Sequence, residues 1–137
     1  MGVTVQPLGV REPDDFEMAF ATMTRERPDA LLLVTDALTI LNRKRVIDFA
    51  ARHRIPAMYE RGYLVREGGL MSYGSDLNDN FRLAAVYIDK ILKGAKPREL
   101  PAQQPTRYYF YINLQTAKSL GVVIPQSVLL RADEVIQ

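Results

Sequence analysis

The segment "DALLLVTD" (29–36) decides the fold class of this chain. Its continuous apolar run, bounded by an aspartate at each end, is typical of a strand that is buried on both faces of a parallel sheet. The preceding segment, residues 14–28, places Phe16, Ala19, Phe20 and Met23 three or four positions apart. That spacing predicts a helix with one apolar face, which leads directly into the strand.

The same alternation of strand and helix continues up to Gly94. "GVTVQPLGV" (2–10) alternates and predicts a further strand, near a sheet edge because of Pro7. After residue 36 the pattern predicts a helix, strands at 55–59 and 70–73, and a last helix that ends at Gly94. Alternating elements indicate an α/β protein with a mainly parallel sheet. The first of these helices has Val46, Phe49, Ala50 and His53 on one side, and the last is expected to carry Phe81, Ala84, Ala85, Ile88 and Leu92 inward.

The chain changes character after Gly94. Residues 95–107 contain three prolines and no periodicity, which predicts an extended connector. "YYFYINL" (108–114) is rich in aromatic and β-branched residues and predicts a strand, with a short helix and a tail beyond it. We therefore divide the chain into residues 1–94, one α/β unit, and residues 95–137, a C-terminal extension of one strand and short helices.

Composition excludes several classes of function. With 18 Lys and Arg against 16 Asp and Glu, the net charge of +2 is too small to indicate a nucleic-acid surface. The chain has no Cys and a single His, His53, which lies between two arginines, so we expect no catalytic residue, no metal and no cofactor. The longest apolar run is far too short to span a bilayer, and the first ten residues do not form a signal peptide.

Polar and aromatic side chains follow the predicted strands where each one ends. In open parallel sheets, ligands bind at the carboxyl ends of the strands. These ends carry Thr35 and Asp36, then Tyr59, then Ser72, Tyr73 and Gly74, and all six are candidate ligand-binding residues. The set suits a small zwitterion, whose ammonium group would pair with Asp36 while a tyrosine packs on its side chain. Alternatively, Asp36 caps a helix and the tyrosines only pack at the rim.

Several segments resemble one family along nearly the whole chain. "GGLMSYG" (68–74), "KILKGAKP" (90–97) and "PQSVLLRADEVI" (125–136) resemble the substrate-binding proteins of ABC transporters. The resemblance is to the type 1 periplasmic-binding fold, in the branch that includes binders of tryptophan and other aromatic amino acids. It implies a three-layer α/β/α lobe, one of two lobes that hold a solute in the cleft between them.

The resemblance also implies how this chain relates to longer family members. They are about twice as long, and residues 1–94 match their second lobe from its second strand onward. Residues 95–137 match a segment expected to return to the first lobe, and the glycines of residues 67–81 match a hinge beside the ligand.

The resemblance implies a solute-binding function without enzymatic activity. The full-length parent would be a periplasmic component that delivers an amino acid or similar solute to an ABC permease. The alternative is a sensor or effector-binding regulatory module of the same fold, which an attached DNA-binding segment would favour.

The aromatic strand at residues 108–113 also predicts an assembly. Without the first lobe, its backbone groups and rings would lie exposed, which folded proteins avoid. We therefore expect a homodimer that forms through residues 95–137. The alternative is that this segment folds back and covers the edge of its own sheet.

Overall fold

Five short strands form one mixed sheet in the order β1-β2-β3-β4-β5. The structure is a computed structural model that describes residues 2–137. β3 and β4 are antiparallel and the other neighbouring pairs are parallel, which confirms the predicted α/β class with a mainly parallel sheet. The strands are β1 (Leu31–Leu32), β2 (Ala57–Tyr59), β3 (Met71–Gly74), β4 (Tyr109–Asn113) and β5 (Glu134–Ile136).

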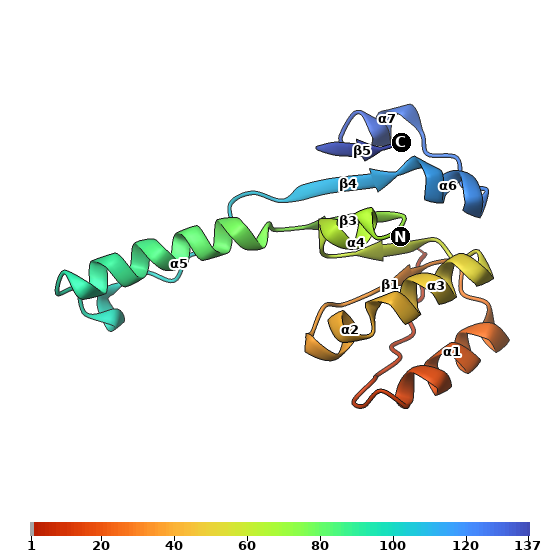
Figure 1. The fold of residues 1–137 in the computed structure, drawn as a ribbon, viewed down its shortest axis with the longest axis horizontal. Coiled ribbons are helices and arrows are strands. Elements are labelled where there is room, and N and C mark those ends of the chain that lie inside the picture. The colour runs from red at the N-terminus through yellow and green to blue at the C-terminus, as the bar shows by residue number, and fades with distance from the viewer. Residues whose placement is uncertain (1) are drawn as a thin grey trace.

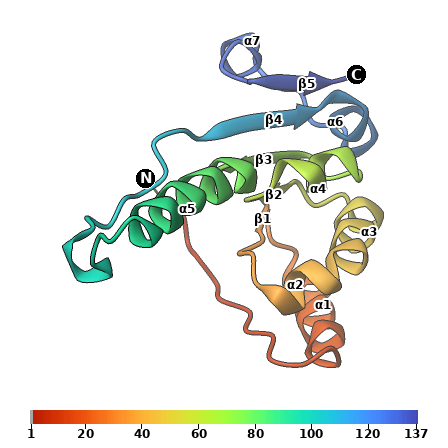
Figure 2. The same ribbon diagram turned by 60° about the vertical axis from the view of Figure 1, so that its left-hand side comes forward.

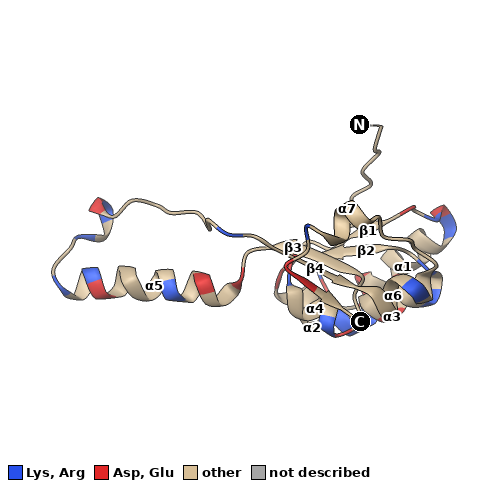
Figure 3. Ribbon diagram, turned by 90° about the horizontal axis from the view of Figure 1, so that it is seen from above, with Lys and Arg blue, Asp and Glu red and all other residues tan. Residues whose placement is uncertain are grey.

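Most of the helices lie near the sheet, whereas one of them extends away from it. Figure 3 shows α3, α4 and α6 on one side of the sheet, and α5 standing apart from it. The helices are α1 (Asp15–Glu26), α2 (Ala37–Leu41), α3 (Arg43–His53), α4 (Gly62–Arg66), α5 (Leu77–Leu92), α6 (Leu114–Leu120) and α7 (Gln126–Leu129), with a short 3-10 helix at Pro97–Glu99.

The core lies between α3, α4 and the sheet. The predicted inner face of α3 is buried through Val46, Phe49 and Ala50, whereas His53 is exposed and packs its ring 4.3 Å from that of Phe49. α1 packs against the same buried face of α3, where Phe20 stacks on Phe49 at 4.3 Å. Apolar burial of this kind is the main stabilising term of a small domain.

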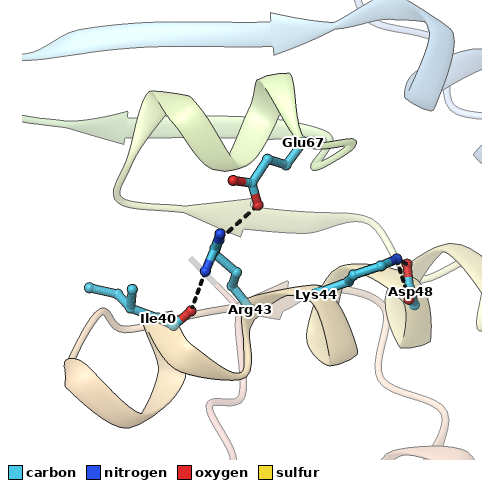
Figure 4. Close-up of polar contacts among 5 residues, drawn as sticks. All are labelled: Ile40, Arg43, Lys44, Asp48 and Glu67. Atoms are coloured by element: carbon cyan, nitrogen blue, oxygen red, sulfur yellow. Dashed lines mark hydrogen bonds and ion pairs between the residues drawn. The ribbon is translucent and has the colours of Figure 1, made fainter.

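One arginine, Arg43, joins three helices. Arg43 Nε donates to Glu67 Oε2 at 2.8 Å, and its Nη1 donates to the Ile40 carbonyl at 3.1 Å (Figure 4). These bonds connect the end of α2, the start of α3 and the end of α4. They help to hold α2, the helix whose first turn follows Asp36.

The first strands differ from the sequence prediction. β1 is an edge strand, and while Leu31 and Leu33 pack on the core, Leu32 and Val34 are 64% and 66% exposed. The prediction of burial on both faces is therefore wrong, because no described element covers the second face at this edge. Residues 2–10 also contain no strand within the described chain. Alternation in the sequence produces a strand only where a neighbouring strand accepts its hydrogen bonds.

The C-terminal segment belongs to the same sheet as residues 31–74. β4 pairs with β3 on one side and with β5 on the other, so the backbone of the aromatic strand is not left exposed. The extension also contributes two strands rather than one. The structure thus has the alternative arrangement, in which residues 108–137 cover their own sheet edge, and the division at residue 94 does not coincide with a break in packing.

Residues 75–107 form the part of the chain that separates from the body. α5 extends away from the sheet, and residues 93–107 return alongside it to β4 (Figures 1 and 2). We call these residues the arm. No residue of α5 is buried among the described residues, so the predicted inward face is wrong: Phe81, Ile88 and Leu92 are 63%, 57% and 82% exposed. The pattern correctly indicated a helix, but its apolar face meets no part of this body.

Candidate functional site

Three loops that follow parallel strands are joined at one edge of the sheet. The Thr35 N–H, after β1, donates to the Glu60 carboxylate, after β2, at 3.1 Å. The Arg61 guanidinium then donates to the Ser75 carbonyl, after β3, at 3.2 Å. Because these loops occupy the carboxyl ends of the strands, they form the edge where α/β proteins bind ligands.

A close backbone approach tightens the same edge. A Cβ added at Gly74 would lie 2.1 Å from the Glu60 carbonyl oxygen, well inside any tolerated contact. Glycine is therefore required at this position because the backbones of the second and third loops touch. This is a different role from the hinge freedom that the sequence suggested for the glycines of residues 67–81.

Asp36 begins α2 in a reciprocal capping arrangement. Its Oδ1 accepts from the Thr39 N–H at 2.7 Å, and the Thr39 hydroxyl accepts from the Asp36 N–H at 2.8 Å. The Thr39 backbone hydrogen bond holds the pKa of the Asp36 carboxyl below its ordinary value. The side chain is exposed, and an ionised carboxylate keeps further acceptor sites for a ligand's ammonium group.

An aromatic cluster lies beside the loops. Tyr73 at the end of β3 stacks on Tyr108 with ring centroids 5.6 Å apart, and its ring meets Phe110 edge-on at 6.4 Å. Tyr73 and Tyr108 are 53% and 48% exposed. β4 is antiparallel to β3, so the beginning of β4 reaches the edge where β3 ends. Tyr108 is not among the predicted binding residues, because the sequence pattern assigned it to a separate unit.

Two of the six predicted site residues point into the interior instead. Tyr59 and Ser72 are each 1% exposed, and Tyr59 is part of the cluster that contains Ile47, Ala57 and Leu64. Burial raises the pKa of Tyr59 to about 12. Neither side chain can reach a solute at the sheet edge without rearrangement, which corrects the prediction for both. Their register partners on neighbouring strands place them on the face that α3 and α4 cover.

The accessible candidates at this edge are therefore Asp36, Tyr73 and Gly74 of the predicted set, with Glu60 and Tyr108 added, and Thr35 joins them through its backbone N–H. The Thr35 hydroxyl oxygen is buried and has no hydrogen-bond partner within residues 2–137. Glu60 is the first residue after the strand that ends at Tyr59, so the sequence also places it at this edge, although it is not one of the six predicted binding residues. Carboxylates beside aromatic rings suit an organic cation or zwitterion with an apolar side chain.

Across residues 2–137, no group of three or more His, Asp and Glu side chains could hold a metal ion. Over the same range, no helix combines the length and the apolar character needed to cross a membrane.

Comparison with solved structures identifies similar folds. A domain from Streptococcus pneumoniae, solved as an ABC domain in complex with L-Trp, has 29% sequence identity and a TM-score of 0.89. The match covers 98% of this chain and 46% of that one. A conserved domain protein from Vibrio cholerae has 26% identity and a TM-score of 0.82, over 89% of this chain and 41% of its own. This chain thus spans less than half the length of either structure.

A third structure shows the fold alone. It is the ligand-free, open form of a substrate-binding protein with adhesive properties from Clostridium difficile. Its sequence identity is 19% and its TM-score 0.63, and the match covers 94% of this chain and 43% of that one. A comparison with curated protein sequences finds no match.

The family comparison agrees with the resemblance seen in the sequence. The model of the family described as "ABC transporter substrate binding protein" matches residues 1–136. That match extends over all five strands and over the arm. This chain therefore belongs to the ABC transporter substrate-binding protein family.

Proposed function

We propose that this chain provides one wall of a solute-binding site that takes a small amino-acid-like zwitterion. The solute lies at the linked loops, where Asp36 pairs with its ammonium group beside Thr35, whose backbone N–H is bound to Glu60. The aromatic pair Tyr73 and Tyr108 packs on its side chain. The stacking of Tyr73 on Tyr108 beside these loops is the observation that carries the assignment.

The comparisons support this reading at a coarser level. The family is one of substrate-binding proteins, and a similar structure was solved with L-Trp bound. Proteins of this family and fold are typically non-enzymatic, and we assign no catalytic role to any residue. We further propose that an ABC permease is the partner that receives the solute, in an importer, and that the protein works in the periplasm.

In this proposal the chain supplies only one of the two walls of the solute-binding site, so we expect its own affinity for the solute to be low. A solute held between two lobes loses about half of its contacts when only one lobe is present, and the exposed surface stays hydrated. We therefore expect this chain alone to bind a free amino acid with a dissociation constant in the millimolar range, about −4 kcal/mol. Micromolar binding would mean that the site lies wholly within residues 1–137.

Chemical-shift mapping tests the assignment at such weak affinity. The ¹⁵N-labelled chain is titrated with L-tryptophan and, separately, with L-leucine, L-glutamate and tryptamine. The backbone amide signals of Thr35, Asp36, Tyr73 and Gly74 should move together, and most strongly with L-tryptophan. Tyr73→Ala should reduce the shifts at Thr35 and Asp36 at least threefold, because the ring that orients the solute is gone.

A matched variant separates a local effect from a general one. Tyr63 is also a partly exposed tyrosine, at 37%, but it lies in α4 on the covered side of the sheet. Tyr63→Ala should leave the titration unchanged. If no amide moves at millimolar solute, or if the moving amides cluster away from the linked loops, this function is wrong.

A further inference from the structure

An amino-acid zwitterion carries a carboxylate as well as an ammonium group, and Asp36 can pair only with the ammonium. The carboxylate is bound most strongly by a charged hydrogen-bond donor. The linked loops consist of residues 33–36, 60–61 and 75–76, and Arg61 is the only cationic side chain among them. It directly follows Glu60 and is the residue from which α4 begins.

The guanidinium of Arg61 reaches from the second loop to the third. Its Nη1 donates to the Ser75 carbonyl at 3.2 Å, and the residue is half-buried. A guanidinium has five N–H donors in a planar fork. The contact with Ser75 uses one of them, so the fork keeps donors for the two oxygens of a bound carboxylate.

The acids at the start of α5 are held by other partners. Asp76 caps this helix, and its Oδ1 accepts from the Asn78 N–H at 2.7 Å. Asp79 Oδ2 accepts from the Tyr109 hydroxyl at 2.9 Å. Both carboxylates therefore contribute to the beginning of the arm, and they leave the guanidinium of Arg61 available to a solute.

Charge is distributed unevenly along the edge that the linked loops form. Asp36 follows β1, and the Glu60 carboxylate is directed toward the same loop, where it accepts from the Thr35 N–H. The two negative groups thus lie on the side of β1, whereas the guanidinium of Arg61 lies on the side of β3. Such a field orients a zwitterion with its ammonium group toward β1 and its carboxylate toward β3.

The span of the edge fits the charged groups of one amino acid. Neighbouring strands lie about 4.8 Å apart, and β2 separates β1 from β3, so the first and third loops are about 10 Å apart. The two bonds between the amino nitrogen and the carboxylate carbon are about 1.5 Å each, and a charge-assisted hydrogen bond at either end adds about 2.8 Å. One amino acid can therefore contact Asp36 and Arg61 at the same time.

We propose that Arg61 binds the carboxylate group of the solute and so selects amino acids over amines and amides that carry the same side chain. This assignment rests on the proposed function and adds a specificity-determining residue to it. The side chain of the solute then lies beside Tyr73, two residues before Ser75. All of these groups lie at the sheet edge itself, so the assignment does not depend on what covers the arm.

Two solutes that differ only at the carboxylate test the role of Arg61. The ¹⁵N-labelled chain is titrated with L-tryptophan and with L-tryptophanamide at about pH 6, where the α-amino group of both is charged. The wild type should bind L-tryptophan about three- to fivefold more tightly than the amide, a modest preference because water screens an exposed ion pair. In Arg61→Gln the ratio of the two affinities should fall to about one, because only the affinity for L-tryptophan decreases.

The ratio of affinities separates solute recognition from support of the loop. If Arg61 only held Ser75 in place, its loss would weaken both solutes equally and leave the ratio unchanged. Arg66→Gln is the matched control, because Arg66 ends the same helix but is bonded to Glu134 at 2.6 Å. Its ratio should equal that of the wild type. Arg61→Lys should keep part of the preference, because the charge remains while the planar fork is lost.

Three results would overturn the role of Arg61. These are a wild-type ratio of one, a ratio that stays at the wild-type value in Arg61→Gln, and a ratio that falls equally in Arg66→Gln. In each case, shifts of the linked-loop amides with L-tryptophan would leave the proposed function standing. If neither solute moves those amides, the proposed function and the role of Arg61 are both wrong.

Discussion

The Asp36 carboxylate accepts the Thr39 N–H at 2.7 Å while the Thr39 hydroxyl accepts the Asp36 N–H at 2.8 Å. Asp36 is thus a helix cap in its own right, as one of the two readings of the sequence expected. The cap fixes the carboxylate at the start of α2, beside Thr35 and the linked loops. A side chain held in this way is preorganised for a ligand, since little rotamer freedom remains to be lost on binding.

Removing the charge of Asp36 separates its two roles. Asparagine caps helices as well as aspartate does, so Asp36→Asn should leave the melting temperature almost unchanged. It should abolish the shifts caused by zwitterionic solutes, because the ammonium group loses its partner. Asp36→Ala should abolish the same shifts and also lower the melting temperature by about 3–5 °C, because the cap is lost. Titrations of Asp36→Asn that match the wild type would exclude an ion pair with Asp36.

Burial of Tyr59 predicts an alkaline loss of stability. Its folded-state pKa is raised to about 12, above the ordinary value of about 10, so its neutral form favours the folded state. This stability contribution is complete below pH 10 and is lost as pH rises through about 12. The loss amounts to about 3 kcal/mol over two pH units. Urea unfolding of wild type and Tyr59→Phe from pH 8 to 12 measures it, and the difference between them should appear above pH 10. Parallel curves would show that Tyr59 titrates normally.

The contact between Gly74 and Glu60 predicts that a single methyl group added at Gly74 destabilises the fold. Gly74→Ala would place a Cβ 2.1 Å from the Glu60 carbonyl oxygen, so the second and third loops must move apart. We expect it to lower the free energy of unfolding by about 1–3 kcal/mol, as overpacking does. Gly9→Ala is the control, because no described atom lies within 4 Å of its added Cβ. Equal stability of the two variants would mean that the loops are not held together at this point.

The buried hydroxyl of Ser72, which has no hydrogen-bond partner among the described residues, predicts that its removal does not lower the free energy of unfolding. Its oxygen is buried without a hydrogen-bond partner in residues 2–137, which is unfavourable. Ser72→Ala should therefore leave the free energy of unfolding unchanged or raise it by up to about 1 kcal/mol. Because the side chain is 1% exposed, the solute titration should also stay as in the wild type. A loss of solute shifts in Ser72→Ala would restore Ser72 to the site.

Local patterns in the sequence determined the elements and their class. The spacing of apolar residues indicated α1, α3 and α5, and the apolar run at residues 29–36 indicated β1. Helix ends followed from side chains nearby in sequence, as with Asp36 before α2 and Gly94 after α5. Signals of this kind depend on neighbours within one or two turns, which is why they can be read without a fold.

Only the tertiary structure decided which surfaces these elements cover and which residues share an edge. The sequence pattern of α5 shows an apolar face, but it does not show that the sheet and its covering helices leave this face exposed. The ring of Tyr59 is buried while that of Tyr73 is exposed, because pairing places the two on opposite faces of the sheet. Tyr108 reaches Tyr73 only because β4 runs antiparallel to β3. Strand register and direction arise from contacts between residues distant in the chain, so a local pattern cannot specify them.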